Sequence, residues 1–437
     1  MRFRQGLVMV TAAAVLLGMG VETTQARSVR KVLRNPDTPQ GQTDVINDAL
    51  QPLGALIGTQ VANQIPTLST SAGFTYEYNP ELEVYERSAR TFGPLFGERA
   101  VTLGKGRFNI NVAHTYLKFK QINGDDLDSL TSRVERATLG GQDSFAGLQR
   151  PDLVGEFNGL TEDQVFTQVI ADLDIEAQII DFSFTYGVLD NLDINIDIPI
   201  VRTYAHIGVS QEVLDPRFTE LLDPDFAASQ PTILEGPSRD REESFGIGDI
   251  RLRTKYLGLT GPVRLGGLMD FVMATGGKKD FRGTGDWRLG TYLIASSTLF
   301  EVFEPHAQAG VEWNINDVDI SQAKYGVGVT TQLTDFAAIS VDFLGRSEFG
   351  RLGRVPNSGR LPKVEDGEFV TDENGALVLE GRPLFADIER NDIFDLALGA
   401  KVALTENAIL FATVSVPLNT DGLRAEFVPT AGFEASF

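Results

Sequence analysis

The sequence predicts an all-β protein, a transmembrane antiparallel up-and-down β-barrel of about twelve strands. From residue 107 onward, segments of about nine to eleven residues alternate apolar and polar side chains, which is the length a tilted strand needs to cross a bilayer. The connections between these segments are alternately long and short, as in barrels of the outer membrane. The composition, with 44 Gly, 28 Phe and 9 Tyr, also favours strands joined by tight turns.

The chain begins with the features of a secretory signal. Arg2 and Arg4 precede an apolar run over residues 7–21, and small residues follow at Thr24 and Ala26. We expect residues 1–26 to be cleaved after export and the mature chain to reside in the cell outer membrane. No later apolar run is as long, so the mature chain is either soluble after export or crosses a membrane without helices.

Residues 27–106 are expected to form an N-terminal segment with a hairpin, which either plugs the lumen or lies on the periplasmic side of the rim. Apolar residues at helical spacing predict a short helical stretch over 42–65, kinked at Pro52. Residues 74–78 and 83–86 are typical of a hairpin. If this hairpin joins the wall, the barrel has about fourteen strands instead of about twelve.

Residues 107–437 are expected to form the barrel itself. The strands are predicted near residues 107–122, 166–187, 192–209, 245–258, 262–275, 287–300, 304–315, 323–333, 336–348, 391–404, 408–418 and 425–437. The short connections are predicted near residues 189–191, 259–261, 301–303, 334–335 and 405–407. Short turns belong to the periplasmic side of such barrels and long loops to the external side.

The alternation assigns an apolar face to lipid and a polar face to a hydrated lumen. In residues 192–200 every even position is apolar, and Asp193, Asn195 and Asp197 lie between them. The residues predicted to line the lumen and set its selectivity are Asp174, Glu176, Asp193, Asn195, Asp197, Arg251, Arg253, Lys255, Glu312, Asp342, Asp395 and Lys401. Strands 192–209 and 245–258 should be neighbours, which sets an acidic row beside a basic row. The rows either orient charged solutes or neutralise one another as cross-strand pairs.

Two strands depart from simple alternation. Around Ile179 and Ile180 the apolar side chains change face, which predicts a bulge or an overlong strand. At the end of the chain, Phe437 and Phe433 share a face of the last strand. This ending resembles the insertion signal of bacterial outer-membrane proteins, so we expect it to engage the barrel-assembly machinery. Pro429 on the same face departs from that pattern and leaves the start of this strand open.

Composition and charge exclude several kinds of chemistry. The chain has no cysteine, which removes disulfides, thiol catalysis and Cys-based zinc sites. Its formal net charge of -22 disfavours nucleic acid as a partner. His114, His206 and His306 have neither metal-ligand spacing nor a Ser/His arrangement, so we expect no enzymatic activity, no metal and no cofactor.

Three loop stretches resemble ligand sites in composition alone. The Gly-rich stretch 276–286 lacks the strand-to-helix context of a phosphate loop, and we interpret it as a flexible external loop. Acidic patches at 125–128 and 365–374 could hold divalent cations through carboxylates, but they lack the ligand order of an EF-hand. We interpret them as solvated loops that face lipopolysaccharide.

Several short motifs together resemble a known family. They are Tyr186-Gly187-Val188 with Leu192-Asp193 and Pro199, GIGDIRLRTKY over 246–256, ATG over 274–276 with GTGD over 283–286, and VPL over 416–418. These motifs are similar to those of outer-membrane proteins assigned as transporters of the MetA pathway of phenol degradation, across residues 165–437. The resemblance implies a β-barrel and suggests uptake of small aromatic or apolar compounds.

The sequence therefore predicts an outer-membrane channel or transporter that passes small molecules by passive diffusion. The expected partners are outer-membrane lipid, lipopolysaccharide, the barrel-assembly machinery and a small-molecule solute. Two alternatives stay open. One is a non-conducting barrel with a structural or adhesion role, and the other is a lipid-modifying barrel enzyme with a His-containing triad at its rim.

Overall fold

A computed structural model describes residues 60–63, 67–71, 73–79, 84–87, 91–136, 165–213, 233–236, 238–350, 361–362, 364–365, 368–370, 379–380 and 392–437. Their main feature is one antiparallel sheet that closes on itself. The expected signal at 1–26 lies outside the described residues, as does most of the expected helical stretch at 42–65. Within that stretch, residues 60–63 are helical.

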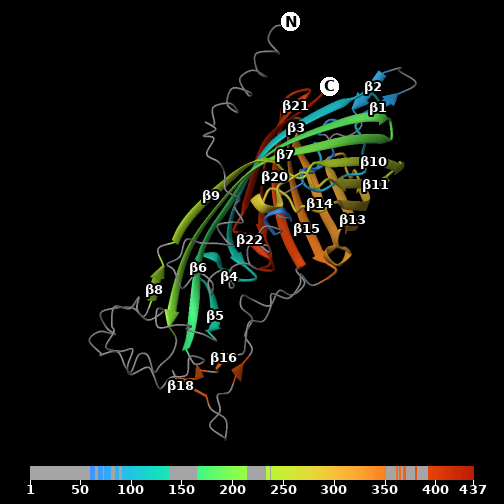
Figure 1. The fold of residues 1–437 in the computed structure, drawn as a ribbon. Coiled ribbons are helices and arrows are strands. Elements are labelled where there is room, and N and C mark those ends of the chain that lie inside the picture. The colour runs from blue at the N-terminus through green and yellow to red at the C-terminus, as the bar shows by residue number, and fades with distance from the viewer. Residues whose placement is uncertain are drawn as a thin grey trace, which may run out of the picture.

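Twelve wall strands close the sheet into a barrel. In order around the wall they are β3 (Phe108–Ile122), β6 (Val165–Leu189), β7 (Leu192–Val213), β9 (Ser238–Ile247) with β10 (Arg251–Leu259), β11 (Val263–Val272), β12 (Arg288–Ser297), β13 (Phe303–Asn314), β14 (Gln322–Thr334), β15 (Ala337–Glu348), β20 (Asp392–Thr405), β21 (Ala408–Pro417) and β23 (Val428–Ser436). β9 and β10 pair with successive parts of β7, so together they make one wall strand. β23 pairs with β3 and closes the cylinder (Figure 1). The predicted wall strands are thus confirmed.

The predicted hairpin forms outside the wall. β1 (Tyr76–Asn79) and β2 (Val84–Arg87) pair with each other in a separate two-stranded sheet. The barrel of about fourteen strands is therefore wrong, and the twelve-stranded barrel is confirmed. Figure 1 shows the hairpin at the end of the barrel that also carries the C-terminus.

The two ends of the barrel carry different connections. Tight turns join β6 to β7, β10 to β11, β14 to β15 and β20 to β21 at one rim, where Phe108 and Phe437 exchange backbone hydrogen bonds of 3.0 and 2.7 Å. The other end carries the long connections, whose described elements are β4 (Asp125–Asp126), η1 (Leu127–Ser129), β5 (Leu130–Arg136), β8 (Ile233–Gly236), η4 (Lys278–Asp280), η5 (Val318–Ile320), β16 (Leu361–Pro362), β17 (Val364–Glu365), β18 (Glu368–Phe369), β19 (Leu379–Glu380) and β22 (Leu423–Ala425). Because short turns mark the periplasmic rim, we assign the long connections to the external side.

The outer face of the wall is an exposed apolar belt. Leu293, near the middle of β12, is 77% exposed. Exposed aromatic side chains mark both edges of the belt, with Phe300 and Phe336 at the turn rim and Trp287 and Trp313 at the opposite edge. An apolar band between two aromatic girdles is the surface that a barrel presents to lipid.

The last strand begins later than expected. β23 starts at Val428, and Pro429 lies opposite Val414 of β21 within a regular register. Phe433 and Phe437 are exposed on the outer face of the wall. Their role as an insertion signal stays a prediction.

β6 carries the change of apolar face without a bulge. Of its 25 residues, those from Thr167 to Gly187 pair with β7 in one continuous register, and the register shifts only at the turn, between Gly187 and Leu189. The buried face is apolar at Ile175 and Ile179, and beyond them the same face turns polar, from Asp181 onward. The overlong strand is confirmed and the bulge is wrong. The environment of each face changes along β6 because its external half extends beyond the lipid-facing belt.

Residues 60–63, 67–71, 73–75 and 91–103, which we call the inner segment, contact the inward-facing side of the wall. Three apolar clusters join the two: Leu68, Leu95 and Phe96 with Ala113, Ala397 and Phe411; Phe74 and Phe92 with Ala338 and Ile409; and Ala100 with Leu268 and Ile294. In the described part of the chain, no helix has the length and apolar character to span a membrane.

Candidate functional site

The predicted acidic and basic rows face each other on the inner wall. Across β7 and β10 the register sets these pairs opposite one another: Asp197 and Arg251, Asn195 and Arg253, and Asp193 and Lys255. Arg253 joins the rows, because its Nε donates to Asn195 over 2.9 Å and its Nη2 lies 3.3 Å from an Asp197 oxygen. Arg251 instead binds Asp270 of β11, with 2.7 Å between Nη1 and Oδ2.

The rest of these rows binds the inner segment. Lys255 Nζ donates to Ser71 Oγ over 2.9 Å and lies 3.6 Å from Glu98 Oε2. Asp193 accepts a hydrogen bond of 2.8 Å from the backbone nitrogen of Leu103. Neutralisation between β7 and β10 therefore explains one bridge, and Arg251 pairs with the next strand instead. Lys255 and Asp193 bind the inner segment, whose position no strand pattern predicts.

Asp174 and Glu176 differ from the other predicted lumen residues. They lie on the face of β6 that carries Phe182 lower down, opposite to the face of the buried Asp181. Both bind Lys118 Nζ, at 3.0 and 2.9 Å. They are outward-facing and do not line the lumen. The prediction assigned the polar side of β6 to the lumen along the whole strand. Beyond the lipid-facing belt, however, the polar side of β6 faces outward.

Glu312 is the centre of a buried ionic group in the external half of the lumen. Its carboxylate lies 3.0 Å from Arg288 Nη1 and 2.7 Å from Lys324 Nζ, and it accepts from Gln322 Nε2 over 2.8 Å. Arg288 also donates to Asn63 of the inner segment over 3.2 Å. Sequence reasoning selected Glu312 alone, although the same period of two places Arg288 and Lys324 on the inner face.

A second group of buried charges joins the inner segment to the periplasmic half. Arg99 Nη1 lies 2.9 Å from Glu304 Oε2, and both side chains are fully buried. Lys401 Nζ lies 3.7 Å from Glu434 Oε2, and Glu434 also accepts from the backbone nitrogen of Gly73. Glu304 was not among the predicted lumen residues, although it shares the alternation of Glu312 on β13. No sequence pattern indicates Arg99.

Asp342 and Asp395 complete the predicted lumen set, and both lie on the inner face. Asp342 is 2.5 Å from His306 Nε2, and Asp395 is 2.5 Å from Arg424 Nη2. His114 and His206 lie on the outward face of their strands. Among the described residues, no group of three or more His, Asp or Glu side chains is arranged to hold a metal ion.

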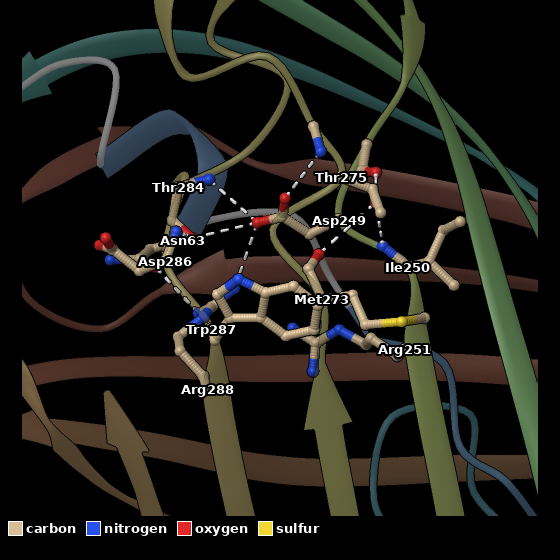
Figure 2. Close-up of polar contacts among 12 residues, drawn as sticks. Asn63, Asp249, Ile250, Arg251, Met273, Thr275, Thr284, Asp286, Trp287 and Arg288 are labelled. Atoms are coloured by element: carbon tan, nitrogen blue, oxygen red, sulfur yellow. Dashed lines mark hydrogen bonds and ion pairs between the residues drawn. The ribbon is translucent and has the colours of Figure 1, made fainter. Parts of the chain in front are cut away.

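The motifs at 246–256, 274–276 and 283–286 meet where the wall strand is interrupted between β9 and β10. Residues 273–287, which we call the strap, connect β11 to β12 at this break. Figure 2 shows Asp249 in contact with the strap. Asp249 accepts from the backbone nitrogens of Gly276, over 3.0 Å, and Thr284, over 2.9 Å. Because a Cβ at Gly283 would lie 2.7 Å from the backbone Cα of Gly276 and 2.3 Å from Asp249 Oδ1, this position requires glycine. The strap lies at the end of the barrel that carries the long connections, and its contacts with Asp249 hold it against the wall.

These features define the class of protein. A closed antiparallel barrel with an exposed apolar belt, aromatic girdles and a polar inner face is an outer-membrane β-barrel.

The sequence matches no protein-family model and no curated protein. Similar solved structures include the COG4313 outer membrane channel from Pseudomonas putida F1, at 11% identity over 77% of this chain and 98% of that chain, with a TM-score of 0.42. The CymD monoaromatic hydrocarbon channel is 11% identical over 76% of this chain and 89% of that chain, with a TM-score of 0.33. The P. putida toluene transporter TodX is 9% identical over 75% and 89%, with a TM-score of 0.34. At these identities and TM-scores, the similarity does not indicate which solute this chain binds.

Proposed function

We propose that the protein is an outer-membrane channel through which small molecules diffuse passively, and that residues 27–106 act as its plug and gate through the inner segment. The observation that carries the proposal is the line of polar contacts between wall and inner segment. It runs from Arg288 with Asn63 in the external half to Arg99 with Glu304 in the periplasmic half. A polar inner face of this kind can be hydrated once the segment moves.

The contacts suit a movable plug better than a permanent core. Buried ion pairs contribute little net stability relative to apolar packing, because desolvation offsets their attraction. The wall charges that bind the segment, such as Glu304, Glu434 and Lys255, would regain water when it leaves. The apolar clusters of the segment are small by comparison.

The inner wall offers contact surfaces for solutes that have both an aromatic or apolar body and a polar group. Ala113, Ala397 and Phe411 form an apolar patch on β3, β20 and β21, which Leu68 and Phe96 of the inner segment cover. The charged rows of β7 and β10 lie elsewhere on the same inner face. A solute that follows the lumen would therefore find both kinds of surface.

A disulfide between plug and wall tests the gate. The Ser296 hydroxyl oxygen lies 3.1 Å from the Ala100 backbone nitrogen, so cysteines at both positions are close enough to be bridged, and the chain has no other cysteine. In planar bilayers we expect the oxidised Ala100→Cys/Ser296→Cys protein to conduct at least about tenfold less than the reduced protein. Liposome swelling with phenolic, fatty and sugar solutes, performed on the reduced form, then ranks the solutes.

The matched control places the disulfide within the wall. Thr115 and Thr430 lie opposite each other on β3 and β23, with 2.8 Å between their hydroxyl oxygens. The Thr115→Cys/Thr430→Cys protein should conduct equally when oxidised and reduced. Equal conductance of both forms of the plug-locked protein would rule out the gate, and silence of both forms would rule out the channel.

The second candidate is a non-conducting barrel with a structural or adhesion role. It is favoured by the tight occupation of the inner face, where Leu68, Phe92 and Leu103 of the inner segment are buried. The same recordings decide between the two functions, because this candidate requires that neither redox form conducts and that no solute swells the liposomes.

A further inference from the structure

Asp181 and Asp197 form a pair of neighbouring carboxyl groups on the inner wall. In the register of β6 and β7, Ser183 lies opposite Asp197 and Pro199 lies opposite Asp181, so the two acids are diagonal neighbours on one face. Both residues are buried, with exposed fractions of 6% and 3%.

The positive charge near this pair falls short by one. Arg253 is the cation in contact with Asp197, at 3.3 Å, and its Nη1 also donates to the carbonyl oxygen of Leu68 over 2.6 Å. The neighbouring Arg251 binds Asp270. No described side chain forms an ion pair with Asp181. Two buried carboxylates therefore share one guanidinium, which leaves an uncompensated negative charge.

The pair also offers free ligand atoms. Oδ1 of Asp181 and Oδ1 of Asp197 are both buried and have no hydrogen-bond partner among the described residues. The inner segment lies beside them, since Leu68 packs on Ala113, the β3 residue opposite Asp181. The free oxygens therefore lie at the seam between wall and plug.

We infer that Asp181 and Asp197 bind a small monovalent cation, either an alkali ion or a primary ammonium group, on the path of the channel. Two carboxylates without a third acidic or histidine ligand in the described part of the chain do not suit a transition metal. They suit a weakly held monovalent cation, which would bind and leave as a conducting site requires. This inference rests on the proposed channel function for its role in conduction, while the binding site itself does not.

Binding is tested apart from conduction. The unfolding temperature of the full-length protein in detergent is measured in potassium chloride, ethylammonium chloride and choline chloride at equal concentration. A cation bound to the folded state raises this temperature, whereas choline is too large and lacks an N–H donor. We expect a higher value in the first two salts, and no difference among the three salts for Asp181→Asn. Asp181 is the better target because Asp197 also supports Arg253.

Asp172→Asn is the matched control, because Asp172 lies on the same strand in an exposed position and loses the same charge. It should keep the salt dependence of the unchanged protein. If all three salts give one unfolding temperature for the unchanged protein, the pair holds a shared proton and the inference is overturned. The inference also fails if Asp172→Asn removes the salt dependence as fully as Asp181→Asn does.

The second measurement concerns selectivity. In a potassium chloride gradient, the reversal potential gives the ratio of potassium to chloride permeability, which we expect Asp181→Asn to lower at least about threefold. Conductance with an unchanged ratio would overturn the role in selectivity. Absence of conductance in every variant would count against the channel function and leave the salt-dependent unfolding as the test of the site.

Discussion

At the scale of the residue, the pair of Arg99 and Glu304 shows what holds the inner segment in place. Both side chains are fully buried, and Thr91 also donates to Glu304. Removing Arg99 leaves the buried Glu304 with the more distant Arg264, at 3.9 Å, as its cation, which costs more than the intact pair contributes. The pair therefore fixes the position of the segment more than it stabilises the barrel.

Arg99→Met should weaken the docking of the inner segment by about 1.5 to 3 kcal/mol, since buried Glu304 would lose its partner at 2.9 Å and keep Arg264 at 3.9 Å. Hydrogen exchange of the backbone amides over 91–103 measures this loss as faster exchange. Lys105→Gln is the control, because Lys105 is exposed just beyond the segment and loses the same charge. Unchanged exchange in Arg99→Met would mean that the segment is held without this pair.

At the scale of the element, close packing between strands depends on glycine at particular positions. A Cβ at Gly310 of β13 would lie 2.1 Å from the carbonyl oxygen of Thr291 and 2.5 Å from the ring of Tyr292. The Thr291 carbonyl oxygen belongs to the backbone of a paired strand, so it cannot move aside as the end of a flexible side chain can. The Tyr292 ring therefore covers a position that has to lack a side chain.

Gly310→Ala should lower the free energy of unfolding by about 2 kcal/mol, because strands β12 and β13 would have to move apart locally. Urea unfolding of the protein in detergent micelles measures the change. Gly267→Ala is the matched control, since a Cβ there would meet its nearest neighbour, the Tyr292 carbonyl oxygen, at an ordinary 3.8 Å. Equal losses in the two variants would show that the effect is general to glycine in the wall.

At the scale of the whole molecule, the barrel depends on lipid for its outer face. Leu293 is 77% exposed in the middle of β12, which would be unfavourable in water. Leu293→Arg should destabilise the protein in lipid vesicles by about 2 to 4 kcal/mol, because an arginine near the bilayer midplane is costly. Tryptophan fluorescence during urea unfolding gives the measurement.

Ser297→Arg serves as the control on the same strand and the same face, near the turn rim. There an arginine should cost about 0 to 1 kcal/mol, since its side chain reaches the interface. A similar cost at both positions would contradict the placement of the belt in hydrocarbon.

The sequence by itself determined the wall. A period of two over segments of membrane-spanning length, with short and long connections in turn, sufficed for the wall strands, because a strand in lipid must show this alternation along its own length. The inward positions of Asp193, Asp197, Arg253 and Glu312 followed from the same local rule. It failed for Asp174 and Glu176, since alternation reports which face is polar and not what surrounds that face.

Only the tertiary structure decided what fills the barrel. The contacts of Arg99 with Glu304 and of Lys255 with Glu98 join residues whose spacing along the chain follows no period. The hairpin at 74–86 likewise met the local requirements of a strand pair, and its exclusion from the wall depended on β3 pairing with β6 and β23. Closure of the cylinder and the position of the inner segment are properties of the whole chain, so no local pattern specifies them.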